Sequence, residues 1–308
     1  MEADQGARRR VDLLRALEPT AEALLNRHLG LTREWFPHEY IPYSLGRDYD
    51  TQPWTPDQPR LHGVARVAFE VNLLTEDNLP SYHRLIHTFF GRGDGAWVNW
   101  ANRWTAEEGR HAIVLRDYLM VTRNCDPVRL ERARMQQVQA GYDHPASEPL
   151  RQLAYVAFQE LATRISHANT GRFSADPVAN RISERIAADE NLHMVFYRDA
   201  VAAALELDPS AAVKAVAAEV IDFQMPGATI PNFSRKAAQI AMAGIYDLRV
   251  HHDEVVWPLL RYWRIFAITS LDSAAEQARD ALAVFLTELN QRASNFEDRR
   301  AERAVTAG

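Results

Sequence analysis

The sequence is poor in the residues and segments that specify several large classes of protein. It contains one cysteine, Cys125, in 308 residues, which excludes a disulfide framework and any cysteine-based zinc or iron–sulfur site. No run of about 18 apolar residues occurs, so we expect no membrane-spanning segment. The first ten residues are polar and charged, so we expect no secretory signal. The formal net charge of −6 argues against a dedicated nucleic-acid binder, and we expect a cytoplasmic protein.

Alternating apolar and polar runs, which are typical of half-buried strands, are nearly absent. Apolar residues instead recur at intervals of three and four, which is typical of amphipathic helices. This spacing predicts helices over residues 64–90, 97–121, 150–167, 177–205 and 275–294. The pairs Asp126-Pro127 and Asp208-Pro209 have the N-cap and N1 pattern of helix starts. We therefore predict an all-α protein.

No shift in composition marks a domain boundary, so we expect a single domain over residues 1–308. Residues 35–59 are rich in proline and tyrosine and lack periodicity, which favours an ordered strap lying on the helices. We divide the chain into four parts. These are an N-terminal strap (about 1–60), a bundle core (about 61–207), C-terminal helices (about 208–295) and a flexible tail (about 296–308).

The sequence Glu-x-x-His occurs twice, at Glu108 with His111 and at Glu190 with His193. Residues three apart lie on one helix face, so each pair presents a carboxylate and an imidazole to one point. Such pairs are common by chance, and one alone is a weak signal. Here both pairs lie within apolar helix faces, which are expected to face a core.

Two more glutamates, Glu76 and Glu160, lie on apolar helix faces. A buried carboxylate without a partner costs several kcal/mol, so four of them are expected to share cations. Glu76 precedes Glu108 by 32 residues, and Glu160 precedes the second motif by 30. Each interval fits one helix, a short loop and the return along the next helix. This set on four helices is the ligand set of ferritin-like carboxylate di-metal bundles.

The expected fold is thus a ferritin-like four-helix bundle with accessory helices and a carboxylate-bridged di-metal site in its core. Oxygen-rich ligation with imidazole and no thiolate favours iron or manganese over structural zinc. For Glu76 a solvated position stays open, because Asp77 is adjacent and Pro80 interrupts the helix one turn later. The remaining histidines, including His251 and His252, are expected on the surface or around the ligands.

Four stretches around these residues resemble the soluble acyl-[acyl carrier protein] desaturases, the plastid stearoyl type and its actinobacterial relatives. The stretches are LTEDNLPSY at 74–82, WTAEEGRH at 104–111, FQELATRISH at 158–167 and IAADENLH at 186–193. The segment WFPHEYIP at 35–42 is similar to the one that precedes the bundle in that family. The resemblance extends over about residues 15–290, and these motifs in this order are highly specific.

The resemblance implies a set of six metal ligands: Glu76, Glu108, His111, Glu160, Glu190 and His193. It implies that Trp35 and Asp189 belong to a route for electrons toward His111. Independently, an aspartate can orient a ligating imidazole through its free N–H. Thr163, one turn after Glu160, matches a threonine beside the oxygen-binding site, which implies a catalytic role. The alternative for Thr163 is a hydroxyl bonded to a helix carbonyl.

The implied reaction is the O₂-dependent removal of two hydrogens from adjacent methylenes of an acyl chain on acyl carrier protein, which forms a cis double bond in fatty acid and lipid biosynthesis. An unactivated C–H bond is beyond acid–base catalysis by side chains, so the chemistry depends on the metals. The implied cofactors are two iron ions, with manganese as the alternative metal. Electrons are expected from ferredoxin or a similar donor, and the resemblance implies a homodimer.

Two other functions stay open. The first alternative keeps the same metal site but makes the protein a hydroxylase or N-oxygenase of a carrier-bound or free substrate. The second alternative belongs to a different class, a ferritin-like iron-storage protein, and the length of 308 residues argues against it. The chain ends soon after the helix near Leu286, earlier than the plant enzymes, and residues 122–149 match less closely. These departures leave acyl length, double-bond position and carrier identity open.

A docking surface for an acidic carrier protein is expected to be locally basic. Arg129, Arg132 and Arg134 form one basic cluster in the sequence, and Arg235 with Lys236 forms another. A solvated helix face explains either cluster equally well.

Overall fold

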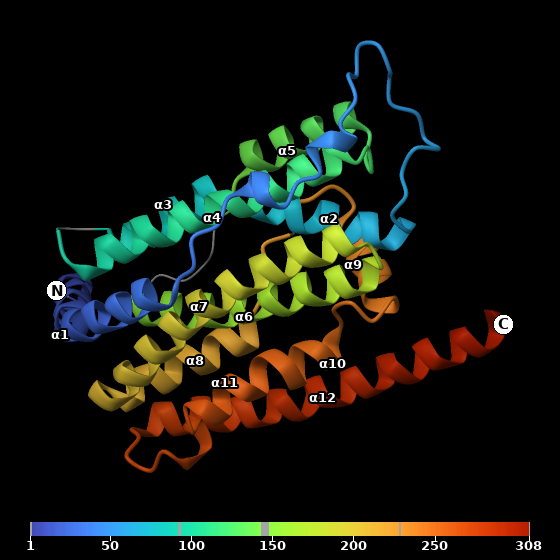
Figure 1. Cartoon of the computed structure of the whole chain (residues 1–308). Helices are drawn as coiled ribbons and strands as arrows, with labels where there is room; N and C mark the ends of the chain where they lie inside the picture. The colour runs from blue at the N-terminus through green and yellow to red at the C-terminus, as the bar shows by residue number, and fades with distance from the viewer. Residues whose placement is uncertain (1, 92–93, 143–147, 228, 308) are drawn as a thin grey trace.

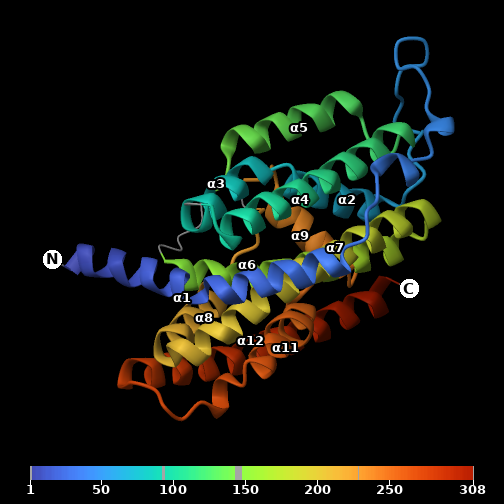
Figure 2. The same cartoon turned by 60° about the vertical axis from the view of Figure 1, so that its left-hand side comes forward.

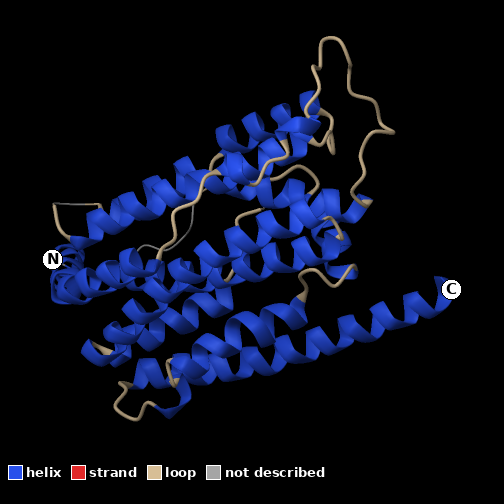
Figure 3. Ribbon diagram, in the orientation of Figure 1, coloured by secondary structure: helices blue, strands red, loops and turns tan. Residues whose placement is uncertain are grey.

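The computed structural model describes residues 2–91, 94–142, 148–227 and 229–307, and within them every regular element is helical (Figure 3). The long helices are α1 (Glu2–Leu31), α4 (Ala96–Val121), α6 (Pro149–Ser174), α7 (Pro177–Leu207) and α12 (Ser273–Ala307). The shorter helices are α2 (Gly63–Glu76), α3 (Leu79–Phe90), α5 (Pro127–Ala140), α8 (Pro209–Asp222), α9 (Phe233–Met242), α10 (Leu248–Val250) and α11 (Trp257–Tyr262). Short turns are η1 (Pro37–Glu39), η2 (Tyr43–Leu45), η4 (Ile265–Ala267) and the π-helical turn η3 (His251–Val256). The predicted all-α class is confirmed.

Four helices, α2, α4, α6 and α7, pack against one another as a bundle. In Figure 1, α3 and α5 lie with α2 and α4 on one side of α6 and α7, and α8, α11 and α12 form a layer on the other side. The largest core cluster joins α1, α4, α6, α7 and α8 and includes Trp100, Phe158 and Phe196. This is the predicted ferritin-like bundle with accessory helices.

Sequence signals explain two of the helix starts. The Asp126 carboxylate accepts the N–H of Val128 over 2.9 Å at the start of α5. The Asp208 carboxylate accepts the N–H of Ala211 over 3.0 Å at the start of α8. In both cases a proline occupies the first helical turn, where its missing N–H is not needed. Both predicted starts are confirmed.

The prediction of one helix over residues 64–90 is wrong, because the chain forms two helices there. α2 ends at Glu76 and α3 begins at Leu79, with Pro80 in its first turn. Proline lacks an N–H and its ring clashes with the preceding turn, so it cannot continue a helix without distortion. The Tyr82 hydroxyl then donates to the Thr75 carbonyl over 3.0 Å across the break. The break makes Glu76 the last residue of α2.

The N-terminal part combines a helix with an irregular segment. α1 packs against α4 and α7, and Figure 2 shows it lying along the bundle. The segment after α1 crosses α4 at η1, and the loop before α2 projects from one end of the molecule (Figure 1). The division of the chain into strap, core, C-terminal helices and tail stays a prediction.

The C-terminal part is helical further than the sequence indicates. α12 continues to Ala307 through the range where a flexible tail is expected, while residue 308 lies outside the described residues. No helix in the described part of the chain is both long and apolar enough to cross a membrane.

Candidate metal centre

Each helix of the bundle brings a buried carboxylate to one region of its interior. At most 6% of the surface of any of the six predicted ligands is exposed. The residues, which together we call the metal centre, are Glu76 on α2, Glu108 and His111 on α4, Glu160 on α6, and Glu190 and His193 on α7. The structure therefore brings all six together, and Glu76 is not solvated.

Their potential ligand atoms form two overlapping groups. One group consists of Glu76, Glu108, His111 and Glu190. The other consists of Glu108, Glu160, Glu190 and His193. Within each group these atoms lie within 4.8 Å of one another. Because Glu108 and Glu190 belong to both groups, they are positioned to bridge a pair of ions, as in carboxylate di-metal bundles.

The two imidazoles turn their Nδ1 atoms toward the carboxylates. His111 Nδ1 lies 3.2 Å from Glu108 Oε2 and 3.7 Å from Glu190 Oε1. His193 Nδ1 lies 2.8 Å from Glu108 Oε1 and 3.6 Å from Glu160 Oε2. Glu108 is thus close to both imidazoles, as a bridging carboxylate must be.

Although these atoms are close, five of them have no hydrogen-bond partner among the described residues. They are Oε1 of Glu108, Oε2 of Glu160, Oε2 of Glu190 and the Nδ1 atoms of His111 and His193. Buried polar atoms are normally paired, and an unpaired one costs about 1–3 kcal/mol. A cation satisfies such atoms because each offers it a lone pair. Four carboxylates and two imidazoles without thiolate suit iron or manganese, so the residues fit the metal pair that the sequence predicts.

Electrostatics also favours a cation. Burial, together with the neighbouring Glu108 and Glu160 carboxylates, raises the pKa of Glu190 well above its ordinary value. Carboxylates this close cannot all stay ionised without compensating positive charge. Divalent ions supply that charge and stabilise the ionised form.

Each imidazole also has a second carboxylate behind it, on the side away from the centre. His111 Nε2 lies 3.5 Å from Asp189 Oδ2, and His193 Nε2 lies 3.0 Å from Glu107 Oε2. An Nε2–H that donates to a carboxylate leaves the Nδ1 lone pair facing the centre. Each of these carboxylates immediately precedes the glutamate of the other Glu-x-x-His motif, so the two motifs support each other reciprocally.

Trp35 lies beside the carboxylate behind His111. Its indole N–H donates to Asp189 Oδ2 over 2.7 Å, and its ring stacks near His111 with centroids 6.4 Å apart. Arg110 and Arg185 donate to the same carboxylate. Burial opposes ionisation, but hydrogen bonding and charge from His111 lower the pKa of Asp189 to about 2. Trp35, Asp189 and His111 form a continuous path, and their role in electron transfer stays a prediction.

Thr163 has two candidate roles in the structure. Its hydroxyl lies 3.1 Å from the carbonyl oxygens of Gln159 and Glu160, which matches the helix-carbonyl alternative. Its side chain also lines an apolar pocket next to Glu76. The catalytic role of Thr163 stays a prediction.

Sequence reasoning missed the partners of the two outer glutamates. His167 Nε2 lies 2.9 Å from Glu76 Oε1. The Trp104 indole N–H donates to Glu160 Oε1 over 2.9 Å. Both partners lie within the stretches that resemble the desaturases, but a spacing along one helix does not indicate a contact between helices.

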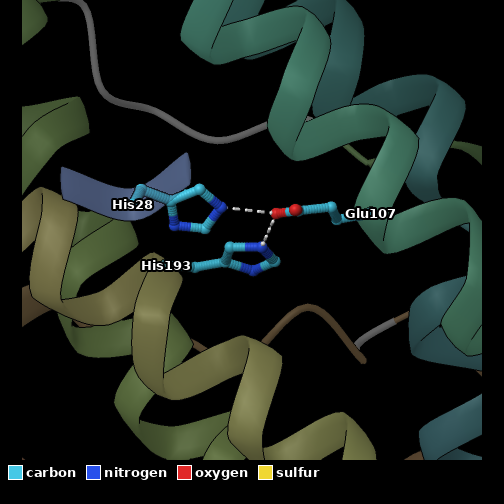
Figure 4. A group of neighbouring side chains, drawn as sticks. All are labelled: His28, Glu107 and His193. Atoms are coloured by element: carbon cyan, nitrogen blue, oxygen red, sulfur yellow. Dashed lines mark hydrogen bonds and ion pairs between the residues drawn. The ribbon is translucent and has the colours of Figure 1, made fainter. Parts of the chain in front are cut away.

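Sequence reasoning also missed Glu107 and His28. Glu107 accepts from His193 and from His28 Nε2, which lies 2.8 Å away (Figure 4). A signal for Glu107 was available, because an acidic residue precedes the glutamate of both Glu-x-x-His motifs. No signal points to His28, since it lies 79 residues before Glu107 on a helix outside the bundle.

An open pocket with a volume of about 100 Å³ reaches the metal centre at Glu76. Its walls join Thr163 to apolar side chains of α2 and α9, among them Val71, Phe233 and Ile240. A smaller cavity is lined by Trp104 and shares Pro226 with the pocket. The apolar pocket thus borders Glu76 and Thr163, and the smaller cavity borders Trp104, the hydrogen-bond partner of Glu160.

Known proteins are similar to this chain over nearly its whole length. The sequence profile of the family described as fatty acid desaturase matches residues 9–307. DesA1 of Mycobacterium tuberculosis, named as an acyl-[acyl-carrier-protein] desaturase, is 50% identical over 298 residues, which cover 93% of this chain and 88% of DesA1. The chloroplastic stearoyl-[acyl-carrier-protein] 9-desaturase 6 of Arabidopsis thaliana is 33% identical over 297 residues, which cover 88% of this chain and 72% of that protein.

A solved structure has the same fold. The X-ray structure of DesA2 from Mycobacterium tuberculosis H37Rv, titled as an acyl-ACP desaturase, matches with a TM-score of 0.70 and 28% sequence identity. The match covers 87% of this chain and 99% of the DesA2 chain. From the family profile and these relatives, together with the buried ligand set, we conclude that the chain belongs to the fatty acid desaturase family.

Proposed function

We propose that this protein is a di-iron desaturase that introduces a cis double bond into an acyl chain carried on acyl carrier protein. The observation that carries the proposal is the pair of buried ligand groups that share Glu108 and Glu190 beside an apolar pocket. The relatives that are named as acyl-[acyl-carrier-protein] desaturases support the same substrate class.

In this proposal Glu76 and His111 would hold one iron ion, and Glu160 and His193 would hold the other. Glu108 and Glu190, which belong to both ligand groups, would contribute to both. The bound ions would supply O₂ activation and hydrogen removal, which side chains cannot supply. The overall reaction consumes one O₂, two electrons and two protons, converts –CH₂–CH₂– to –CH=CH– and releases two waters. Ferredoxin or a similar external donor supplies the electrons.

The chain's own residues hold and shield this centre. Asp189 and Glu107 fix the tautomer of the two imidazoles, and His167 and Trp104 orient the outer glutamates. Such supporting partners typically change metal affinity or activity by about 10–100-fold. The apolar walls of the pocket exclude water and bind an acyl chain by the hydrophobic effect.

We infer that the acidic carrier docks near α9. Arg129 on α5 and Lys236 on α9 both pair with the buried Glu70, at 2.8 Å each, so the two basic clusters of the sequence meet there. Arg235 is exposed on the same helix, and Phe233 of that helix lines the apolar pocket. Charge complementarity supports this surface, and Arg235→Glu should raise KM for the acyl carrier with little change in kcat.

A homodimer is likewise expected, and sedimentation of the purified chain measures its oligomeric state.

The test of the function is mass spectrometry of a panel of acyl carriers after incubation with iron-loaded protein, O₂ and a reducing system. A desaturase lowers the acyl mass by two hydrogens, whereas a hydroxylase raises it by one oxygen. An iron-storage protein leaves the acyl chain unchanged and accumulates a ferric mineral. Unaltered acyl carriers at every chain length would refute the proposal.

A further inference from the structure

One carboxylate oxygen near the metal centre receives two imidazoles from different helices. His28, in the last turn of α1, points its Nε2 at Glu107 Oε2 on α4 over 2.8 Å, and His193 on α7 points its Nε2 at the same oxygen over 3.0 Å (Figure 4). The side chains of His28 and Glu107 are each 3% exposed, and that of His193 is fully buried. Water therefore does not compete for these hydrogen bonds.

The other oxygen of Glu107 is also occupied. Arg103 donates its Nε to Glu107 Oε1 over 2.7 Å as part of an ion pair along α4. An ionised carboxylate only accepts hydrogen bonds, so both imidazoles donate through Nε2–H. An imidazole that donates through Nε2–H has only Nδ1 left to offer a lone pair to a cation, and in His193 this is the atom that faces Glu108 and Glu160.

His28 is itself held in one orientation. Its ring meets the Trp100 ring edge to face at 5.0 Å and lies nearly parallel to the His193 ring at 5.8 Å. Its Nδ1 is buried and has no hydrogen-bond partner among the described residues. Glu107 is therefore its polar partner in the described part of the chain, and that pairing selects the Nε2–H tautomer of His28.

We propose that His28 is a positioning residue of the metal centre, which holds Glu107 in the orientation that fixes the ring and tautomer of His193. The inference rests on the proposed function, since it takes His193 as a metal ligand. Without His28, Oε2 of Glu107 keeps only the contact with His193 and Oε1 keeps only the guanidinium of Arg103, which is 39% exposed, so the carboxylate is held less firmly. The N-terminal helix, although it lies outside the four-helix bundle, is thus part of the metal site.

The test is metal binding to the full-length protein, measured without turnover. Metal-free wild type, His28→Phe, His28→Met and His28→Gln are titrated anaerobically with Co(II), and binding is followed by ligand-field absorption. The Phe and Met variants fill the volume but cannot donate a hydrogen bond, whereas the Gln side chain restores an N–H. His38→Phe is the matched control, because His38 is exposed and contacts Phe36 rather than the centre.

We expect the Phe and Met variants to bind one Co(II) as wild type does and the second about 10–100-fold more weakly, with an altered absorption band. The Gln and His38→Phe variants should bind both ions within about threefold of wild type. A merely structural role for His28 predicts a lower unfolding temperature of the metal-free Phe and Met variants with normal Co(II) affinity and spectrum, and this result would overturn the inference alone. Wild-type protein that binds no pair of ions would overturn the proposed function and the inference together.

Discussion

The two inward-facing imidazoles have matching carboxylates behind them but different surroundings. Behind His111, the Asp189 carboxylate receives an indole N–H from Trp35 and two guanidinium groups. Behind His193, the Glu107 carboxylate receives a second imidazole, His28, and one guanidinium group. The duplicated motif thus accounts for the ligands and the carboxylates, whereas the N-terminal segment makes the two sides different.

The distance between imidazole and carboxylate also differs between the two sides. Asp189 lies 3.5 Å from its imidazole, while Glu107 lies 3.0 Å from its own. Because hydrogen bonds weaken beyond about 3.2 Å, His193 is held more tightly than His111. The comparison suggests that the two imidazoles differ in role. His193 is held rigidly by Glu107, whereas His111 is connected through Asp189 to the aromatic ring of Trp35.

Removing a glutamate shared by both ligand groups should have the largest effect on activity, because both groups then lose a ligand. Glu108→Gln or Glu190→Gln is expected to lower product formation by about 1000-fold or more, since both ions lose a ligand and the loss of several kcal/mol of stabilisation has that size. Metal content and acyl mass spectrometry measure the effect. Glu131→Gln, a partly exposed residue paired with Arg116, is the control, and equal activity of all variants would contradict the assignment.

Removing one carboxylate behind an imidazole should affect one side only. Asp189→Asn and Glu107→Gln are each expected to weaken the binding of one of the two metal ions by about 10–100-fold. The neutral amide that replaces the carboxylate accepts a weaker hydrogen bond from the imidazole, and its NH₂ group cannot accept one at all. Titration with Co(II) should give two distinguishable spectra, one for each variant. Identical spectra would mean that the two sides are equivalent.

Replacing the aromatic group should separate binding from electron delivery. Trp35→Phe removes the indole N–H that donates to Asp189, and we expect about tenfold slower reduction by ferredoxin with normal metal stoichiometry. Stopped-flow reduction by ferredoxin measures this rate, and reduction by dithionite, a small reductant that does not require the path, is the control. If both reductants slow down equally, Trp35 acts on the ligand and not on the electron path.

The smallest expected effect is on acid stability. Because the pKa of Asp189 is lowered to about 2 from an ordinary value of 3.8, its ionised form contributes stability that is fully present above pH 3.8 and is lost as the pH falls through 2. In metal-free protein about 1 kcal/mol of this contribution should be lost between pH 7 and pH 3. Urea unfolding at both pH values should therefore show a smaller difference between wild type and Asp189→Asn at pH 3. If the difference in the free energy of unfolding between wild type and Asp189→Asn is the same at both pH values, this prediction is wrong.

Much of the centre could be predicted from the sequence because its geometry is local. The period of an α-helix puts Glu108 with His111 and Glu190 with His193 on one face each, and the apolar neighbours indicate which face is buried. Pro80 also marks a helix break in the sequence, but the apolar periodicity continues across it and does not show that the chain forms two separate helices there. The missing information concerns contacts between distant segments. His28 and His167 reach their carboxylates from 79 and 91 residues away, and helical periodicity carries no record of such pairings.

The place of His28 in the chain also has a consequence for biosynthesis. A ribosome completes α1 long before α7 exists. His28 can therefore bind Glu107 only after α4 has been synthesised, and both can contact His193 only after α7 has been synthesised. The His193 side of the centre is therefore completed late, after about two thirds of the polypeptide has been made. Until then the pair formed by His28 and Glu107 lacks the imidazole that it positions in the folded protein.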